Sequence, residues 1–201
     1  MKYSKLVLAS ASPRRAELLK RAGVAFTVMP ALGCPEILKD GEPPADAVMR
    51  LAELKAESVY SRLVSMGAAE ADENGGILVL GADTLVFLDG APLGKPRDRA
   101  DAAATLKSLC GRVHEVYTGV CFVFAGKKLK IYEKTYVAFG AFDDKIVYNY
   151  IESGKPFDKA GGYGVQDAEI RPLIKGIDGD ADNVIGLPVA AVLKILKEKF
   201  V

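Results

Sequence analysis

The sequence has few of the residues that build disulfide frameworks and transition-metal sites. It contains three scattered cysteines, Cys34, Cys110 and Cys121, and a single histidine, His114. The odd, scattered count argues against a disulfide framework and for a reducing cytoplasm. No Cys-x-x-Cys pair occurs, so a thiolate zinc site is excluded. A metal, if one is used, must be held by carboxylates, which favours Mg²⁺ or Mn²⁺ over zinc.

Long apolar runs and an excess of one charge are also missing. The longest uncharged run, Ala22 to Pro35, is interrupted by glycine and proline and is shorter than the ~20 residues of a membrane span. The N-terminus shows no signal-peptide pattern. The 27 basic and 26 acidic side chains leave a formal net charge of +1. We therefore expect neither nucleic acid nor a membrane as a partner.

The sequence does contain alternating strand and helix patterns along its 201 residues, a length that suits one domain over 1–201. Prolines at helix starts and the Asp89-Gly90 hairpin signal mark the boundaries. Helices are expected at 13–22, 44–66, 143–152 and 188–200, and another is capped by Asp98 or Asp101 and stops at Gly111. Strands are expected at 5–10, 24–29, 77–80, 85–88, 91–93, 113–124 and 129–139, and a polar connection at 67–76. Because the last two strands form an antiparallel hairpin, the predicted class is α/β with a mixed sheet flanked by helices.

Two hydroxyls and two arginines follow the first strand, in Ser10-Ala11-Ser12-Pro13-Arg14-Arg15. The N-terminus of a helix presents free N–H groups and partial positive charge, which disfavours arginine in the first turn. Two arginines there indicate an anion to bind, and guanidinium forks suit phosphate. The alternative is a pair of solvated surface arginines beside an ordinary helix cap.

A carboxylate and a lysine come from the middle of the chain. Asp83 and Thr84 follow a buried strand, at the place where open α/β sheets put their sites. Asp83 can ligate a hard cation or act as a general base, or it can be a turn residue that bonds its own backbone. Lys95, in Gly94-Lys95-Pro96, comes one hairpin later, which predicts that it lies near Asp83 and contacts phosphate.

A glycine-rich stretch from Asp158-Lys159 to Gln166 has the composition of a loop that approaches a ligand closely, or of a flexible turn. Gln166 carries both a donor and an acceptor, which suits recognition of a base edge. His114 lies in a predicted strand and is expected to be structural. The combined set indicates metal-assisted attack of water on a phosphoanhydride.

Six motifs in one order resemble the Maf family, also called septum formation inhibitor or Maf-like nucleoside triphosphate pyrophosphatases. They are SASPRR, GADT, GKPR, YTG, SGKPFDKAGGYGVQ and NVIGLPV. The resemblance implies a cytoplasmic, homodimeric enzyme that cleaves nucleoside triphosphates to monophosphate and pyrophosphate with Mg²⁺ or Mn²⁺. It also implies an elongated, two-lobed fold like that of inosine triphosphate pyrophosphatases. The DKAGGYGVQ form resembles the branch that acts on dTTP and UTP.

The resemblance also assigns roles by position. Asp83 would be the proton acceptor and, with Glu36, a metal ligand, and Lys95 would join these two as a catalytic residue. The substrate-binding set would be Ser10, Ser12, Arg14, Arg15, Lys55, Thr84, Lys159 and Gln166. Two other functions stay open: a non-catalytic nucleotide-sensing regulator of cell division, and a phosphatase that releases orthophosphate.

Overall fold

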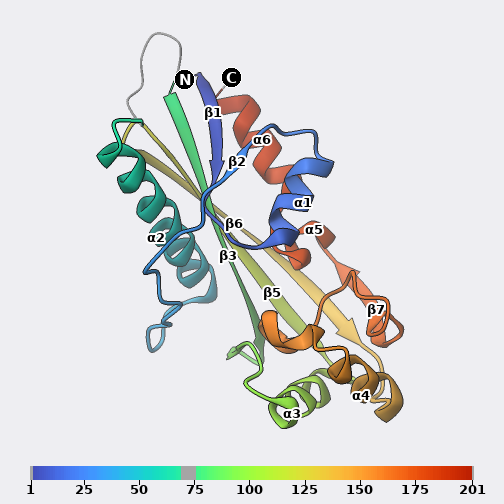
Figure 1. Cartoon of the computed structure of the whole chain (residues 1–201). Helices are drawn as coiled ribbons and strands as arrows, with labels where there is room; N and C mark the ends of the chain where they lie inside the picture. Colours follow the sequence, from blue (N-terminus) through green and yellow to red (C-terminus); the bar gives the residue numbers. More distant parts are fainter. Residues whose placement is uncertain (1, 69–75, 201) are drawn as a thin grey trace. The chain divides into compact units, whose positions relative to one another are not determined.

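The computed structural model describes residues 2–68 and 76–200, and it confirms the α/β class with a mixed sheet (Figure 1). The expected polar connection at 67–76 falls largely outside the described residues. In the sheet, β1 runs parallel to β2 and β3, whereas β4 pairs antiparallel with β3 and β7 with β6. The order is β2-β1-β3-β5-β6-β7, formed by β1 (Tyr3–Leu8), β2 (Thr27–Val28), β3 (Gly76–Leu88), β5 (Val113–Phe124), β6 (Lys127–Phe139) and β7 (Ile174–Asp178), with β4 (Ala91–Leu93) beside β3.

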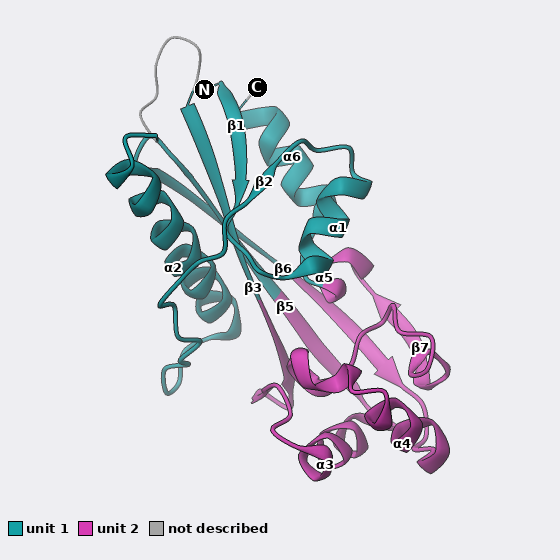
Figure 2. Ribbon diagram, in the orientation of Figure 1, with its two compact units in different colours: residues 1–83, 118–133, 186–201 teal, residues 84–117, 134–185 magenta. Residues whose placement is uncertain are grey.

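The chain divides into two compact units that alternate along the sequence (Figure 2). Unit 1 comprises residues 1–83, 118–133 and 186–201, and unit 2 comprises 84–117 and 134–185. The prediction of a single domain over 1–201 stays a prediction. The helices are α1 (Pro13–Arg21), α2 (Pro44–Ser65) and α6 (Val189–Lys199) in unit 1, and α3 (Arg99–Leu109), α4 (Asp144–Glu152) and α5 (Ala181–Ile185) in unit 2.

The strands of unit 1 are covered by helices on both faces, with α2 on one side of β1 and β3 and with α1 and α6 on the other (Figure 1). Side chains alternate between the faces of a strand, and Val7, Val79 and Val123 pack with residues of α2. Phe200, which follows α6, lies against Phe122 and Phe124 at ring distances of 5.8 and 5.9 Å. The core on the α2 side consists of Val7, Ala9, Ala52, Ala56, Val59, Leu63, Val79, Cys121 and Val123.

Two glycines let the backbone of α2 rest directly on the sheet. A Cβ atom added at Gly81 in β3 would lie 2.3 Å from the carbonyl oxygen of Ala52, and one added at Gly119 in β5 would lie 2.3 Å from that of Val48. No larger residue fits there unless the helix moves. This close approach brings Lys55 of α2 into contact with Asp83 of β3.

The sequence prediction was wrong about the course of β3. A strand was expected to end at Leu80 and another to begin at Leu85, but the two are one continuous strand. β3 pairs with β1 as far as Leu80 and with β4 from Val86 onward. Because it pairs with one strand after another, β3 continues past the end of β1. Asp83 therefore lies inside a strand and not in a turn after it. The elements β7 and α5 were also not expected.

The core of unit 2 contains the histidine, and the expectation that it is structural fits its position. His114 is 1% exposed, and its Nε2 lies 2.5 Å from the hydroxyl oxygen of Tyr163. Its ring makes edge-to-face contacts with Phe139 and Tyr163, both at 5.3 Å. Burial lowers the pKa of His114 to about 4, because the charged imidazolium would lose its hydration.

His114 should make the stability of the protein depend on pH. The unfolded chain binds a proton at this residue near pH 6.5 and the folded chain only near pH 4, so its contribution is complete above pH 6.5 and is lost as pH falls toward 4. The lost free energy of unfolding is about 3 kcal/mol. We expect urea unfolding of His114→Gln to show a weaker pH dependence than wild type between pH 7 and 5. Equal slopes would show that the histidine does not titrate in this way.

Candidate functional site

A buried carboxylate of unit 1 is paired with a lysine that it shares with a second carboxylate. Asp83 is 2% exposed, and its Oδ1 accepts a hydrogen bond from the ammonium group of Lys55 in α2. The same Nζ atom lies 2.7 Å from Oε1 of Glu36. Oδ2 of Asp83 is buried and has no hydrogen-bond partner among the described residues. The structure thus brings together three of the predicted site residues.

The loop that carries Glu36 is held along α2 by side chains of that helix. Ser58 donates to the carbonyl of Leu32 at 2.9 Å. Arg50 forms a two-pronged pair with Glu42, at 2.7 and 2.6 Å, and also donates to the carbonyl of Ile37 at 2.9 Å. Because these contacts lie on both sides of Glu36, they fix where its carboxylate meets Lys55.

The Ser10–Arg15 motif forms the turn from β1 into α1. Ser12 occupies the N-cap position of α1, but its side chain makes no capping hydrogen bond. The hydroxyl of Ser10 instead accepts from the amide of Ser12 at 3.2 Å and from Nη1 of Arg15 at 3.1 Å. Arg15 is buried, and its Nε donates to the carbonyl of Gly186 at 2.7 Å. Arg15 therefore also ties this turn to the NVIGLPV motif, while Arg14 stays partly exposed.

The charges of these groups act on one another. Burial raises the pKa of Asp83, and the nearby positive charges of Lys55 and Arg15 oppose that rise. Burial lowers the pKa of Arg15, and the negative charges of Asp83 and Glu36 oppose that change. A carboxylate with a raised pKa is a better proton acceptor, because its conjugate acid is weaker.

The donor set suits a hard divalent cation that keeps part of its own hydration. Asp83 and Glu36 offer carboxylate oxygens close to one ammonium group, and the unpartnered Oδ2 of Asp83 needs a partner. Over residues 2–68 and 76–200, no group of three or more His, Cys, Asp or Glu side chains could hold a metal ion. Mg²⁺ is commonly bound by one or two carboxylates, with water and substrate phosphates as its other ligands. Asp83 and Glu36 therefore fit such an ion.

In unit 2, the Gly94-Lys95-Pro96 motif and the glycine-rich loop lie side by side. The amide of Gly161 donates to the carbonyl of Gly94 at 3.0 Å. A Cβ atom added at Gly161 would lie 3.1 Å from Val86, and one at Gly162 would lie 2.9 Å from Pro96. Both glycines have φ of 69°, which other residues rarely adopt. Glycine is required here because the loop is pressed against the β3–β4 hairpin.

The predicted residues of unit 2 lie around this hairpin and loop. Lys95 and Gln166 are exposed, Thr84 is partly buried, and Lys159 is 8% exposed. The ammonium group of Lys159 donates to the carbonyl of Lys155 at 2.6 Å and to Asp158 at 2.9 Å. The predicted proximity of Lys95 to Asp83 stays a prediction.

A family model described as Maf-like protein matches residues 5–199. The chain belongs to the Maf family. A relative from Agathobacter rectalis, named dTTP/UTP pyrophosphatase, is 45% identical over 97% of this chain and 97% of its own length. A relative of the same name from Chlorobaculum tepidum is 44% identical over 98% of this chain and 96% of its own length. A HAM1 protein structure from Coxiella burnetii aligns with a TM-score of 0.43 and 16% identity, covering 69% of this chain and 73% of that one.

Membership of the Maf family confirms the resemblance drawn from the six motifs. Within the described part of the chain, no helix is long and apolar enough to cross a membrane. Sequence reasoning missed Arg50, which fixes the Glu36 loop, and Tyr150 and Asp167, which contact the glycine-rich loop. For Asp167 the sequence offered one signal, its place directly after Gln166, a predicted substrate-binding residue.

Proposed function

We propose that this Maf protein hydrolyses dTTP and UTP to the monophosphate and pyrophosphate. Full-length relatives with more than 40% identity carry the name dTTP/UTP pyrophosphatase. The observation that carries the chemistry is the buried carboxylate of Asp83. One of its oxygens accepts a hydrogen bond from Lys55, and the other has no hydrogen-bond partner in the part of the chain that the structure describes. Such a carboxylate can accept a proton from water without first breaking a hydrogen bond.

In this mechanism water attacks the α-phosphorus, the bond to the bridging oxygen of the β-phosphate breaks, and pyrophosphate leaves. The proton of the water passes to the carboxylate of Asp83. Lys55 and Arg15 hold positive charge near the reacting carboxylate, and Arg14, Ser10, Ser12 and Lys95 bind phosphate oxygens. Gln166 and Thr84 contribute to the choice of substrate.

A divalent cation, Mg²⁺ or Mn²⁺, would be held by Asp83 and Glu36. When bound, it supplies charge neutralisation of the phosphates and polarisation of the anhydride. We also propose a cytoplasmic homodimer, as the family resemblance implies. The free thiols of Cys34, Cys110 and Cys121 support a reducing compartment.

The purified protein is expected to release pyrophosphate and monophosphate in equal amounts from UTP and dTTP when Mg²⁺ or Mn²⁺ is present. Quantifying pyrophosphate and orthophosphate separately over the first turnovers is the measurement, with and without a chelator. Orthophosphate as the first product would favour a phosphatase. Tight nucleotide binding without any product would favour a non-catalytic regulator. Full activity in chelator would contradict the metal assignment.

A further inference from the structure

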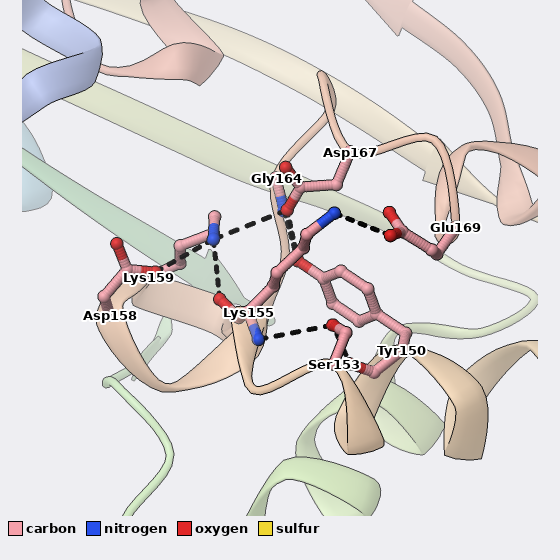
Figure 3. Close-up of polar contacts among 8 residues, drawn as sticks. All are labelled: Tyr150, Ser153, Lys155, Asp158, Lys159, Gly164, Asp167 and Glu169. Carbon is pink, nitrogen blue, oxygen red and sulfur yellow. Dashed lines mark hydrogen bonds and ion pairs between the residues drawn. The ribbon is translucent and has the colours of Figure 1, made fainter.

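A cluster of polar contacts joins the glycine-rich loop of unit 2 to α4 (Figure 3). Tyr150 of α4 is fully buried, and its hydroxyl donates to Oδ2 of Asp167 at 2.6 Å. The same hydroxyl oxygen accepts from the amide of Gly164 at 3.2 Å. One phenol therefore connects the middle of the loop to the residue that follows Gln166.

Lys159 closes the cluster on its other side. Its Nζ lies 3.4 Å from Oδ2 of Asp167, and the side chains of Lys159 and Asp167 are only 9% and 12% exposed. The same ammonium group also contacts Asp158 and the carbonyl of Lys155 (Figure 3). The ammonium group of Lys159 and the hydroxyl of Tyr150 hold this carboxylate in place. Asp167 therefore presents a fixed carboxylate next to Gln166.

Gly164 has no side chain, and the side chains of Gln166, Asp167 and Lys159 lie close to its backbone. A Cβ atom there would lie 2.5 Å from Nε2 of Gln166, 2.9 Å from Oδ2 of Asp167 and 2.9 Å from Cε of Lys159. The amide of Gln166 and the carboxylate of Asp167 thus approach the same point of the backbone. The carboxylate of Asp167 favours the orientation in which the NH₂ group of Gln166 faces it. It opposes the flipped orientation, in which the amide oxygen of Gln166 would face the carboxylate.

We propose that Asp167, held by Tyr150 and Lys159, is a positioning residue that fixes the amide orientation of Gln166 and thereby sets base selectivity. The inference rests on the proposed function. A uracil or thymine edge presents an N3–H donor beside a carbonyl, which matches the Gln166 oxygen and NH₂ group in one order. Cytosine presents an unprotonated N3 beside an amino group, which needs the reverse order. By opposing the flip, Asp167 would favour UTP and dTTP over CTP.

The test measures kcat/KM of pyrophosphate release for UTP and CTP in wild type, two single variants, their double variant and a control. Asp167→Asn keeps the shape and removes the charge, and Tyr150→Phe removes the hydrogen bonds that hold Asp167 and Gly164. Each should lower the UTP-to-CTP ratio by about 3- to 10-fold, the size of one hydrogen bond. The double variant should lower it by less than the product of the two single effects, because both act through one carboxylate.

Glu169→Gln is the matched control. It removes the 2.6 Å ion pair between Lys155 and Glu169, which is more exposed and belongs to the same segment (Figure 3). The control should keep the wild-type ratio and melting temperature. A folded Asp167→Asn with the wild-type ratio, or a control that shifts the ratio equally, would overturn the proposal.

Hydrogen exchange separates this proposal from the proposed function. In Tyr150→Phe the amide of Gly164 loses its acceptor, so exchange over 161–167 should accelerate while that of β5 stays unchanged. This result would support the positioning cluster even if wild type released no pyrophosphate, an outcome that would contradict only the proposed function. Unchanged exchange in the loop would contradict the cluster itself.

Discussion

Asp83→Asn is expected to lower kcat for UTP by about 10²-fold or more, the range for loss of a general base. The amide has the same shape as the carboxylate, so it can occupy the same place in β3. Its nitrogen or oxygen cannot accept a proton from water at neutral pH. Because Lys55 keeps its second carboxylate partner, Glu36, at 2.7 Å, the fold should be retained. The measurement is steady-state pyrophosphate release at saturating metal and nucleotide, together with a melting curve.

A matched control makes the same chemical change at an exposed aspartate of the same strand-and-turn segment. Asp89 lies in the β3–β4 turn with a side chain that is 70% exposed, and its φ of 51° suits asparagine as well as aspartate. Asp89→Asn should therefore keep the wild-type rate. Near-wild-type turnover in Asp83→Asn would show that another group accepts the proton.

The sequence predicted the elements whose signals are local. Asp98 accepts from the amide of Asp101 at 2.8 Å as the cap of α3, and Asp89-Gly90 forms the expected hairpin turn. α2 begins at Pro44, as its proline and apolar period indicated. Each of these signals lies within a few residues of the structure that it specifies, so composition and spacing suffice.

The contacts that define the candidate site join residues far apart in sequence, and pattern alone could not predict them. Lys55 and Asp83 are 28 positions apart, and Arg15 and Gly186 are 171 apart. The first contact depends on how closely α2 approaches the sheet, which Gly81 and Gly119 allow. β7 was missed because its pairing with β6 stabilises a short stretch, Ile174–Asp178, that has little strand pattern of its own.

The second large effect is expected from a substitution of Gly81. In Gly81→Ala the new Cβ atom would meet the carbonyl oxygen of Ala52 at 2.3 Å and the backbone nitrogen of Ala56 at 2.7 Å. These are backbone atoms inside a helix, so no side chain can rotate away and α2 itself must move. Overpacking of this kind costs about 3 kcal/mol, near the upper end of the usual range.

For a chain of this length, such a loss should lower the melting temperature by about 6–12 °C. Movement of α2 also displaces Lys55 from Asp83, so pyrophosphate release should fall even at temperatures where the variant is folded. Gly176→Ala is the control, because Gly176 also lies in a strand and a Cβ atom there would meet nothing within 4 Å. The control should melt within about 2 °C of wild type, since open surface positions tolerate such changes. Equal melting temperatures for Gly81→Ala and wild type would mean that α2 does not rest on β3 as closely as the structure shows.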